Sequence, residues 1–425
     1  MVDCRETPEP VGDRVQRAAL RMALLAFYGG GVLAISALFL PRGVFLDPVS
    51  GVWGRLPSDA AAHSRAMALG FCALFVLSFL CRMVPRATRT PLVRPRLAGA
   101  GAVLLLGAAV FDGAGGLQTQ VGGLVLGACW LGAVGAWAGS LGATWRRRRA
   151  PLPWFGGWIG GGLLVLGGVG LASGVAAILG QHDTLARVAS ATLFGGITPI
   201  AAGLSVKMLP SMGGVGPADR EAARVPTLLV AAVGGTVAAG FVLAEPFLTF
   251  LGHLGLLVVV GMALRGLGWL RLRSDGHPAA QASRQDPESR ALRWSGRVAW
   301  LALMVGLATG LVAHGASTWG LEPAGLSTRS LEVLSAHLIG AGFLVTLMLG
   351  VGQRLLPGFV RSDVRWPRLR HGLLILMVGA LLTRVAATVA PATMPWALHG
   401  ALGLLLFAVL LFHVQVSPSI RAPDG

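Results

Sequence analysis

The sequence predicts an all-α polytopic membrane protein with about twelve transmembrane helices and both termini in the cytoplasm. Of its 425 residues, 54% are hydrophobic and 12% are charged, and the mean hydropathy is +0.70. About a quarter of the residues are charged in a typical soluble domain. The apolar residues also occur in long runs, and the basic residues collect between alternate runs. This composition therefore indicates a protein that is embedded in lipid.

Twelve apolar runs approach the length of about 20 residues that a transmembrane helix needs. They cover residues 20–40, 62–84, 97–114, 120–144, 154–180, 186–209, 225–244, 247–270, 297–316, 331–353, 372–389 and 396–416. The third run is short and contains Asp112. The pattern predicts one transmembrane domain, 20–416, between a cytoplasmic N-terminal segment, 1–19, and a cytoplasmic tail, 417–425.

The distribution of basic residues predicts the orientation. If the N-terminus lies inside, 29 of the 35 basic residues flank cytoplasmic helix ends and 5 flank outer ends, while Arg384 lies within a run. Cytoplasmic loops carry such an excess, so we expect a multi-pass protein of the bacterial inner (cytoplasmic) membrane, surrounded by the lipid bilayer. The net charge of +17 does not indicate nucleic-acid binding, because the charges lie in short loops.

A short motif recurs at the ends of runs two, six and ten. In each run a basic residue lies eleven positions after the first residue of the motif, which we call the reference position. A proline lies three positions after that basic residue. The motif residues are Phe71, Arg82 and Pro85; Gly196, Lys207 and Pro210; and Phe343, Arg354 and Pro357. A helix that ends inside commonly finishes with a basic residue and a helix-stopping proline, which is the simpler explanation. The spacing of four helices favours three four-helix pseudo-repeats, at about 20–144, 154–270 and 297–416.

Six of the nine histidines are expected near the outer face of the membrane. They are His63, His182, His253, His314, His337 and His399. Ionisable groups in a membrane are costly and usually functional, and neutral imidazole is a common ligand of metals and haem iron. A haem or metal layer is therefore one interpretation, and ordinary interfacial histidines are the other.

Two histidines open helices that end in the motif. His63 begins run two, and His337 lies at the same depth in run ten, so the pair could hold a haem iron from both sides. Met67 lies one turn after His63 on the same helix face. Arg384 lies in the outer half of run eleven, where a haem propionate, a carboxylate or snorkelling would offset its charge. These four residues form the predicted haem site.

A copper site is the second cofactor hypothesis. Imidazole ligands suit copper, and His253, His314 and His399 are the candidate donors beside the haem pair. No spacing in the sequence defines the site.

These motifs resemble a known family. Residues 63–71, His-Ser-Arg-Ala-Met-Ala-Leu-Gly-Phe, are similar to the His-Ala-His-Glu-Met-Leu-Phe-Gly-Phe signature of the NnrS family, haem- and copper-containing membrane proteins linked to nitric oxide stress. The stretches 336–354 and 381–385 also resemble that family. The resemblance implies haem b, copper and a small gaseous ligand such as nitric oxide. Arg65 and Ala66 replace the second histidine and the glutamate of the signature.

The predicted architecture is also similar to the catalytic subunit of haem–copper oxidases, in which histidines of helices two and ten hold the low-spin haem. His63 and His337 match those places. The high-spin haem histidine is replaced by Ser335, helix six lacks His-Pro-Glu, and the run at 225–244 contains no histidine. Terminal oxidase activity is therefore not expected, and other enzymatic activity is left open. A cofactor-free transporter and a degenerate structural relative of the oxidases are the alternative functions.

Overall fold

The computed structural model describes residues 15, 17–19, 21–25, 63–113, 120–150, 154–179, 181–213, 221, 224–267, 287–321, 323, 326–360, 366–390 and 394–421. The regular elements within these residues are all helical. In chain order they are η1 (Ala66–Cys72), α3 (Ala73–Thr88), α4 (Pro95–Gly113), α5 (Gln120–Arg146), α6 (Gly156–Ile178), α7 (His182–Ser190), η3 (Ala191–Ile197), α8 (Thr198–Gly213), α9 (Thr227–Leu243), α10 (Pro246–Leu267), α12 (Pro287–Trp319), α13 (Thr328–His337), η5 (Leu338–Val345), α14 (Thr346–Val360), η6 (Pro367–Leu369), α15 (Arg370–Val389) and α16 (Met394–Arg421).

Nine helices in the described part of the chain are long and apolar enough to cross a membrane. Two shorter apolar helices, Pro95–Phe111 and Thr227–Leu243, correspond to the predicted third and seventh runs. The first predicted run, 20–40, lies largely outside the described residues. The all-helical membrane class is confirmed, and the total of twelve spans stays a prediction.

Three continuous helices occupy the middle of the molecule, and we call them the central helices. They are η1 with α3, α7 with η3 and α8, and α13 with η5 and α14. Their most apolar windows are 89%, 94% and 72% buried within the protein, whereas the corresponding windows of the other six candidate spans are 28–56% buried. The segment η1 contacts both η3 and η5, and α8 contacts η5 and α14. These are the helices that carry the repeated motif.

Each central helix contains one π-helical segment, and all three lie at the same register. The segments η1, η3 and η5 each begin five residues before the reference position of the motif. In a π-turn the backbone hydrogen bond spans five residues, and such turns are rare and often lie at functional sites. Their recurrence at one register is a structural counterpart of the sequence motif.

The motif prolines do not stop the helices, contrary to the sequence interpretation. Pro85, Pro210 and Pro357 lie inside α3, α8 and α14. Each of these helices ends three residues after its proline. A proline removes one backbone hydrogen bond, but the residues after it can still complete a last turn.

Two predicted helix ends also need correction. α12 begins at Pro287, ten residues before the predicted run, and α16 extends to Arg421, past residue 416. Hydropathy marks only the part of a helix that lies in lipid, whereas backbone hydrogen bonding continues through polar residues beyond it. Proline is favoured at the first helical position, which fits the start of α12 at Pro287.

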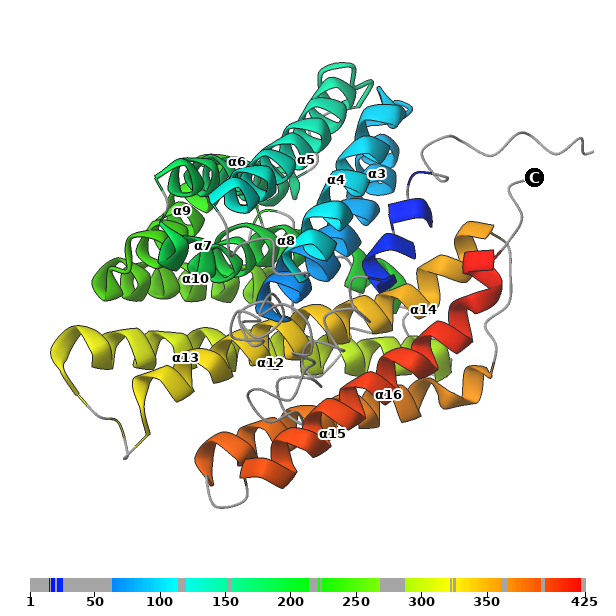
Figure 1. Cartoon of the computed structure of the whole chain (residues 1–425). Coiled ribbons are helices and arrows are strands. Elements are labelled where there is room, and N and C mark those ends of the chain that lie inside the picture. The colour runs from blue at the N-terminus through cyan, green and yellow to red at the C-terminus, as the bar shows by residue number, and fades with distance from the viewer. Residues whose placement is uncertain are drawn as a thin grey trace, which may run out of the picture.

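The outer helices pack as antiparallel pairs around the central helices. α4 pairs with α5, α9 with α10, and α15 with α16. Figure 1 shows α15 and α16 side by side next to α14, with α4 and α5 beside α3. Each pair follows a central helix in the chain, so one order of elements recurs three times.

Glycines permit the closest of these contacts. Gly195 in η3 faces Gly234 in α9, and a Cβ atom added to Gly195 would lie 2.6 Å from the Gly234 carbonyl oxygen. The reciprocal Cβ on Gly234 would meet the Gly195 carbonyl oxygen. Small residues let helix backbones approach closely in lipid. A methyl group at either position would therefore force the two helices apart.

We expect Gly234→Ala to lower the thermal unfolding midpoint of the purified protein. Overpacking costs about 1–3 kcal/mol, which exceeds the roughly 0.5–1 kcal/mol that alanine gains over glycine in a helix. Gly235→Ala is the matched control, because an added Cβ there has no neighbour within 4 Å, and its midpoint should stay equal or rise. Equal losses in both variants would contradict the close packing.

Candidate functional site

Two of the predicted haem residues lie toward the N-terminal ends of two central helices. His63 precedes η1, and His337 is the last residue of α13, directly before η5. His337 lies within electrostatic range of both His63 and Arg384. These three residues come from helices that are far apart in the sequence. The structure therefore brings them to one place.

Hydrogen bonding fixes the orientation of the His337 imidazole. Its Nδ1 atom lies 2.8 Å from the carbonyl oxygen of Val333, one turn earlier. A carbonyl only accepts, so Nδ1 carries the proton and the neutral ring keeps a lone pair on Nε2. A metal-ligating histidine characteristically donates its other N–H to a backbone carbonyl or carboxylate. The ring is thus prepared for a ligand on Nε2.

Arg384 on α15 is the third member of this group. Its Nε atom is buried and has no hydrogen-bond partner among the described residues. A buried guanidinium N–H without an acceptor is costly. The atom is consequently a candidate to bind an anionic group. Met67 lies in η1, partly buried against the hydrophobic core.

A second group of side chains forms a four-ring cluster of Phe194, Phe241, His253 and His314. The ring centroids of His253 and His314 are 5.2 Å apart. Phe194 lies 5.0 Å from His253 and 5.2 Å from Phe241, and Phe241 lies 5.4 Å from His314. The rings come from η3, α9, α10 and α12. Two of the three predicted copper donors are therefore neighbours.

His253 is fully buried in this cluster. Its Nδ1 atom lies 2.8 Å from the carbonyl oxygen of Thr249, so Nδ1 donates and Nε2 holds the lone pair. That Nε2 atom is buried and has no hydrogen-bond partner among the described residues. A Cβ atom added to Gly310 in α12 would lie 2.5 Å from Nε2 and 2.9 Å from Ser335 Oγ. Glycine at 310 therefore makes room for the imidazole.

Acidic and basic side chains lie between His314 and the protein surface. Its Nδ1 atom lies 3.7 Å from Glu332 Oε1, and Arg329 Nη1 lies 3.5 Å from Glu332 Oε2. The His314 side chain is 7% exposed, that of Glu332 29% and that of Arg329 83%. A chain of charges thus leads from the surface to the buried imidazole pair. No sequence spacing predicted that Glu332 would lie beside these histidines.

His399, the third predicted copper donor, lies on a different helix pair. His399 is near the start of α16, which packs on α14 and α15, whereas His253 and His314 are on α10 and α12. Within the described residues no group of three or more His, Cys, Asp or Glu side chains is arranged to hold a metal ion. His253 and His314 are the copper candidates whose rings lie in contact in the structure.

Ser335 and two phenylalanines complete the surroundings of the buried histidines. Ser335 Oγ donates a 2.7 Å hydrogen bond to the Gly306 carbonyl oxygen, which ties α13 to α12. Helices η3 and α9 contribute the phenyl rings of Phe194 and Phe241 to the cluster. Phenyl rings offer no lone pair to a metal. Neither of these two side chains can therefore ligate a metal.

Comparisons with known proteins agree with this architecture. The profile of the NnrS protein family matches residues 18–423. No curated protein sequence matches the chain. A solved structure of a haem–copper terminal oxidase dimer superimposes with a TM-score of 0.64 at 11% identity, covering 97% of this chain and 84% of that chain. At this identity the superposition establishes a shared fold.

We expect Gly310→Ala to displace the His253 ring and to lower the unfolding midpoint, because the methyl group would collide with Nε2. Gly261→Ala on α10 is the control, since its added Cβ has no neighbour within 4 Å. Thermal unfolding, combined with the ¹³C shifts of labelled histidine, measures both effects. An unchanged His253 signal in Gly310→Ala would show that the imidazole does not lie against α12.

Proposed function

Because the chain belongs to the NnrS family, we propose that it is a haem-binding membrane protein that acts in nitric oxide stress or denitrification-linked metabolism. The observation that carries the proposal is the convergence of His63, His337 and Arg384 from three separate helices. The resemblance supplies the link to nitric oxide, and the haem–copper oxidase fold gives a precedent for haem between helices two and ten.

The residues present fit a haem b group. His337 keeps its Nε2 lone pair, because Nδ1 donates to Val333, and His63 lies within electrostatic range. The buried Nε–H of Arg384 lacks an acceptor among the described residues, and a propionate carboxylate would supply one. Met67 adds a thioether, another known axial ligand type. Bound haem would supply one-electron redox chemistry and binding of small gaseous ligands.

We expect protein purified from haem-replete cells to show a Soret band and, after reduction, an α-band. His63→Ala or His337→Ala should abolish both bands, because each removes an iron ligand. Nitric oxide added to the reduced wild-type protein should shift the bands by displacing one of the two histidines from the iron. Absorption spectra with haem extraction measure all three effects.

The matched control for this experiment is His371→Ala, since His371 lies exposed near the start of α15 and its loss should leave the spectrum unchanged. Arg384→Gln should retain the bands but weaken haem retention, because it removes the positive charge from the propionate site. Colourless wild-type protein would reject the haem proposal and favour a cofactor-free transporter or a degenerate relative.

We further propose that His253 and His314 form a copper site of this protein. Both imidazoles are buried, their centroids are 5.2 Å apart, and the His253 Nε2 lone pair has no partner among the described residues. Imidazole is a suitable copper ligand. Glu332 beside His314 could neutralise part of the charge of a bound cation.

We expect purified protein equilibrated with Cu(I) to retain close to one copper per chain at this site, measured by elemental analysis after desalting. His253→Phe should lose that copper, because it keeps an aromatic ring of similar size but has no lone pair. His371→Ala should retain it. Equal copper in wild type and His253→Phe would contradict the site without affecting the haem proposal.

The finer topology is also a proposal. We place twelve spans in the bacterial inner membrane, with both termini inside and three four-helix units at about 20–144, 154–270 and 297–416. Support comes from the excess of basic residues on one side, the π-helical segments at one register and the threefold recurrence of a helix pair after a central helix.

A further inference from the structure

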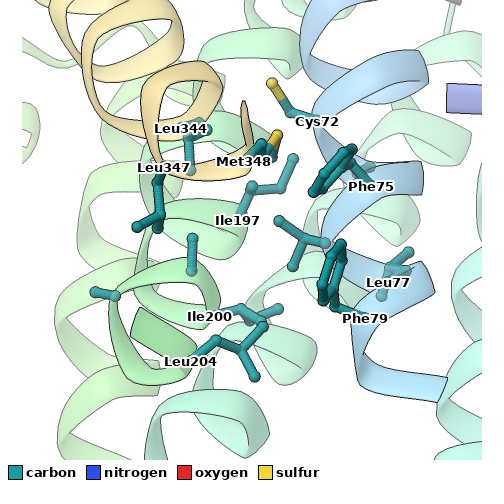
Figure 2. Close-up of a cluster of buried hydrophobic side chains, with 14 of the residues drawn as sticks. Cys72, Phe75, Leu77, Phe79, Ile197, Ile200, Leu204, Leu344, Leu347 and Met348 are labelled. Carbon is teal, nitrogen blue, oxygen red and sulfur yellow. The ribbon is translucent and has the colours of Figure 1, made fainter. Parts of the chain in front are cut away.

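A small cavity of about 40 Å³ lies between the three central helices. Figure 2 shows this region, where Phe75 and Phe79 of α3 face Leu204 of α8 and Leu347 of α14. Most of its lining residues follow the π-helical segments in the chain, so the cavity lies toward the helix ends that carry the motif prolines.

The three helices contribute equivalent positions to this cavity. Counted from the motif reference positions, the lining includes the residues five and eight places later in every helix. These residues are Val76 and Phe79, Ala201 and Leu204, and Met348 and Val351. The same face of each helix therefore points to one place. The cavity lies where an approximate threefold axis relating the helices would pass.

The void has a local cause in the sequence. At the position five places after the reference, two helices carry Val76 and Met348, whereas α8 carries the small side chain of Ala201. Protein interiors normally leave few voids larger than a water molecule. Because the Ala201 side chain is smaller than its counterparts on the other two helices, the space between the helices is not filled.

The wall of the cavity is apolar. Ser205 is the one polar residue among the described residues that line it, and Ser205 Oγ donates a 2.8 Å hydrogen bond to the Ala202 carbonyl oxygen. A buried water needs two to four polar partners, and apolar cavities remain dry. The space exceeds the roughly 10–15 Å³ that one water requires and is far smaller than the cavities of about 150 Å³ that bind benzene.

We propose that this axial cavity binds one small, neutral, apolar molecule of the size of a xenon atom or a diatomic gas. Charged and strongly polar ligands are excluded, because the wall offers them no hydrogen bonds. Binding uses dispersion contacts with side chains that otherwise face a void. The inference goes beyond the proposed function, since the lining residues are separate from the candidate haem and copper residues.

Xenon is the probe for this proposal. We expect crystals of the full-length protein held under xenon pressure to show one anomalous peak between Phe79, Ala201 and Leu347. Ala201→Leu should abolish the peak, because the larger side chain fills the space. Ala386→Leu is the matched control, as Ala386 lies exposed on α15, and it should keep the peak at wild-type height.

A second variant covers the case in which Ala201→Leu fails to fold. Leu347→Ala enlarges the cavity and should raise xenon occupancy at a given pressure and also admit cyclopropane, which the wild-type cavity is too small to hold. His337→Ala should keep the xenon peak, so loss of haem and loss of the cavity are distinguishable. Ordered water in the wild-type cavity, or no xenon there in well-folded protein, would overturn the proposal.

Discussion

Every polar group within the bilayer must find its partner inside the protein, because lipid offers no hydrogen bonds, and this constraint organises the structure. Hydroxyl groups satisfy it locally: Ser173 Oγ donates to the Val169 carbonyl, and Thr383 Oγ1 to that of Gly379. The amide side chains of Gln353 and Gln415 satisfy it across helices, bonding to each other between α14 and α16. The Nε2 of His253 and the Nε of Arg384 are two of several buried side-chain atoms that have no hydrogen-bond partner among the described residues, and our proposals assign a ligand to each of them.

Hydropathy predicted most of the fold, because in lipid the apolar runs and the helices nearly coincide. Eleven of the twelve runs correspond to helices in the described residues. The π-helical segments were not predicted, because a single π-turn leaves no trace in the hydropathy of an apolar run. Helix ends such as Pro287 were also not predicted, because hydropathy does not detect helical turns that extend into water. The repeated motif, by contrast, was visible as a spacing and identified the helices that the structure places at the centre.

The candidate sites were predicted only in part. Depth along a helix can be estimated from the sequence, and that estimate predicted His63 and His337 at one level. Which helices face each other depends on packing between distant segments, so the pairing of His253 with His314 and the neighbouring Glu332 became visible only in the structure. The small residue Gly310, which makes room for His253, carried no signal among the chain's 62 glycines.

The shared register of the π-helical segments bears on the history of the chain. A π-turn holds one residue more than an α-helical turn of the same rise, so each segment is equivalent to a one-residue insertion. Three independent insertions at the same place in three helices would be a considerable coincidence. If the three units descend from one ancestral four-helix segment, the extra residue was already present before that segment was triplicated.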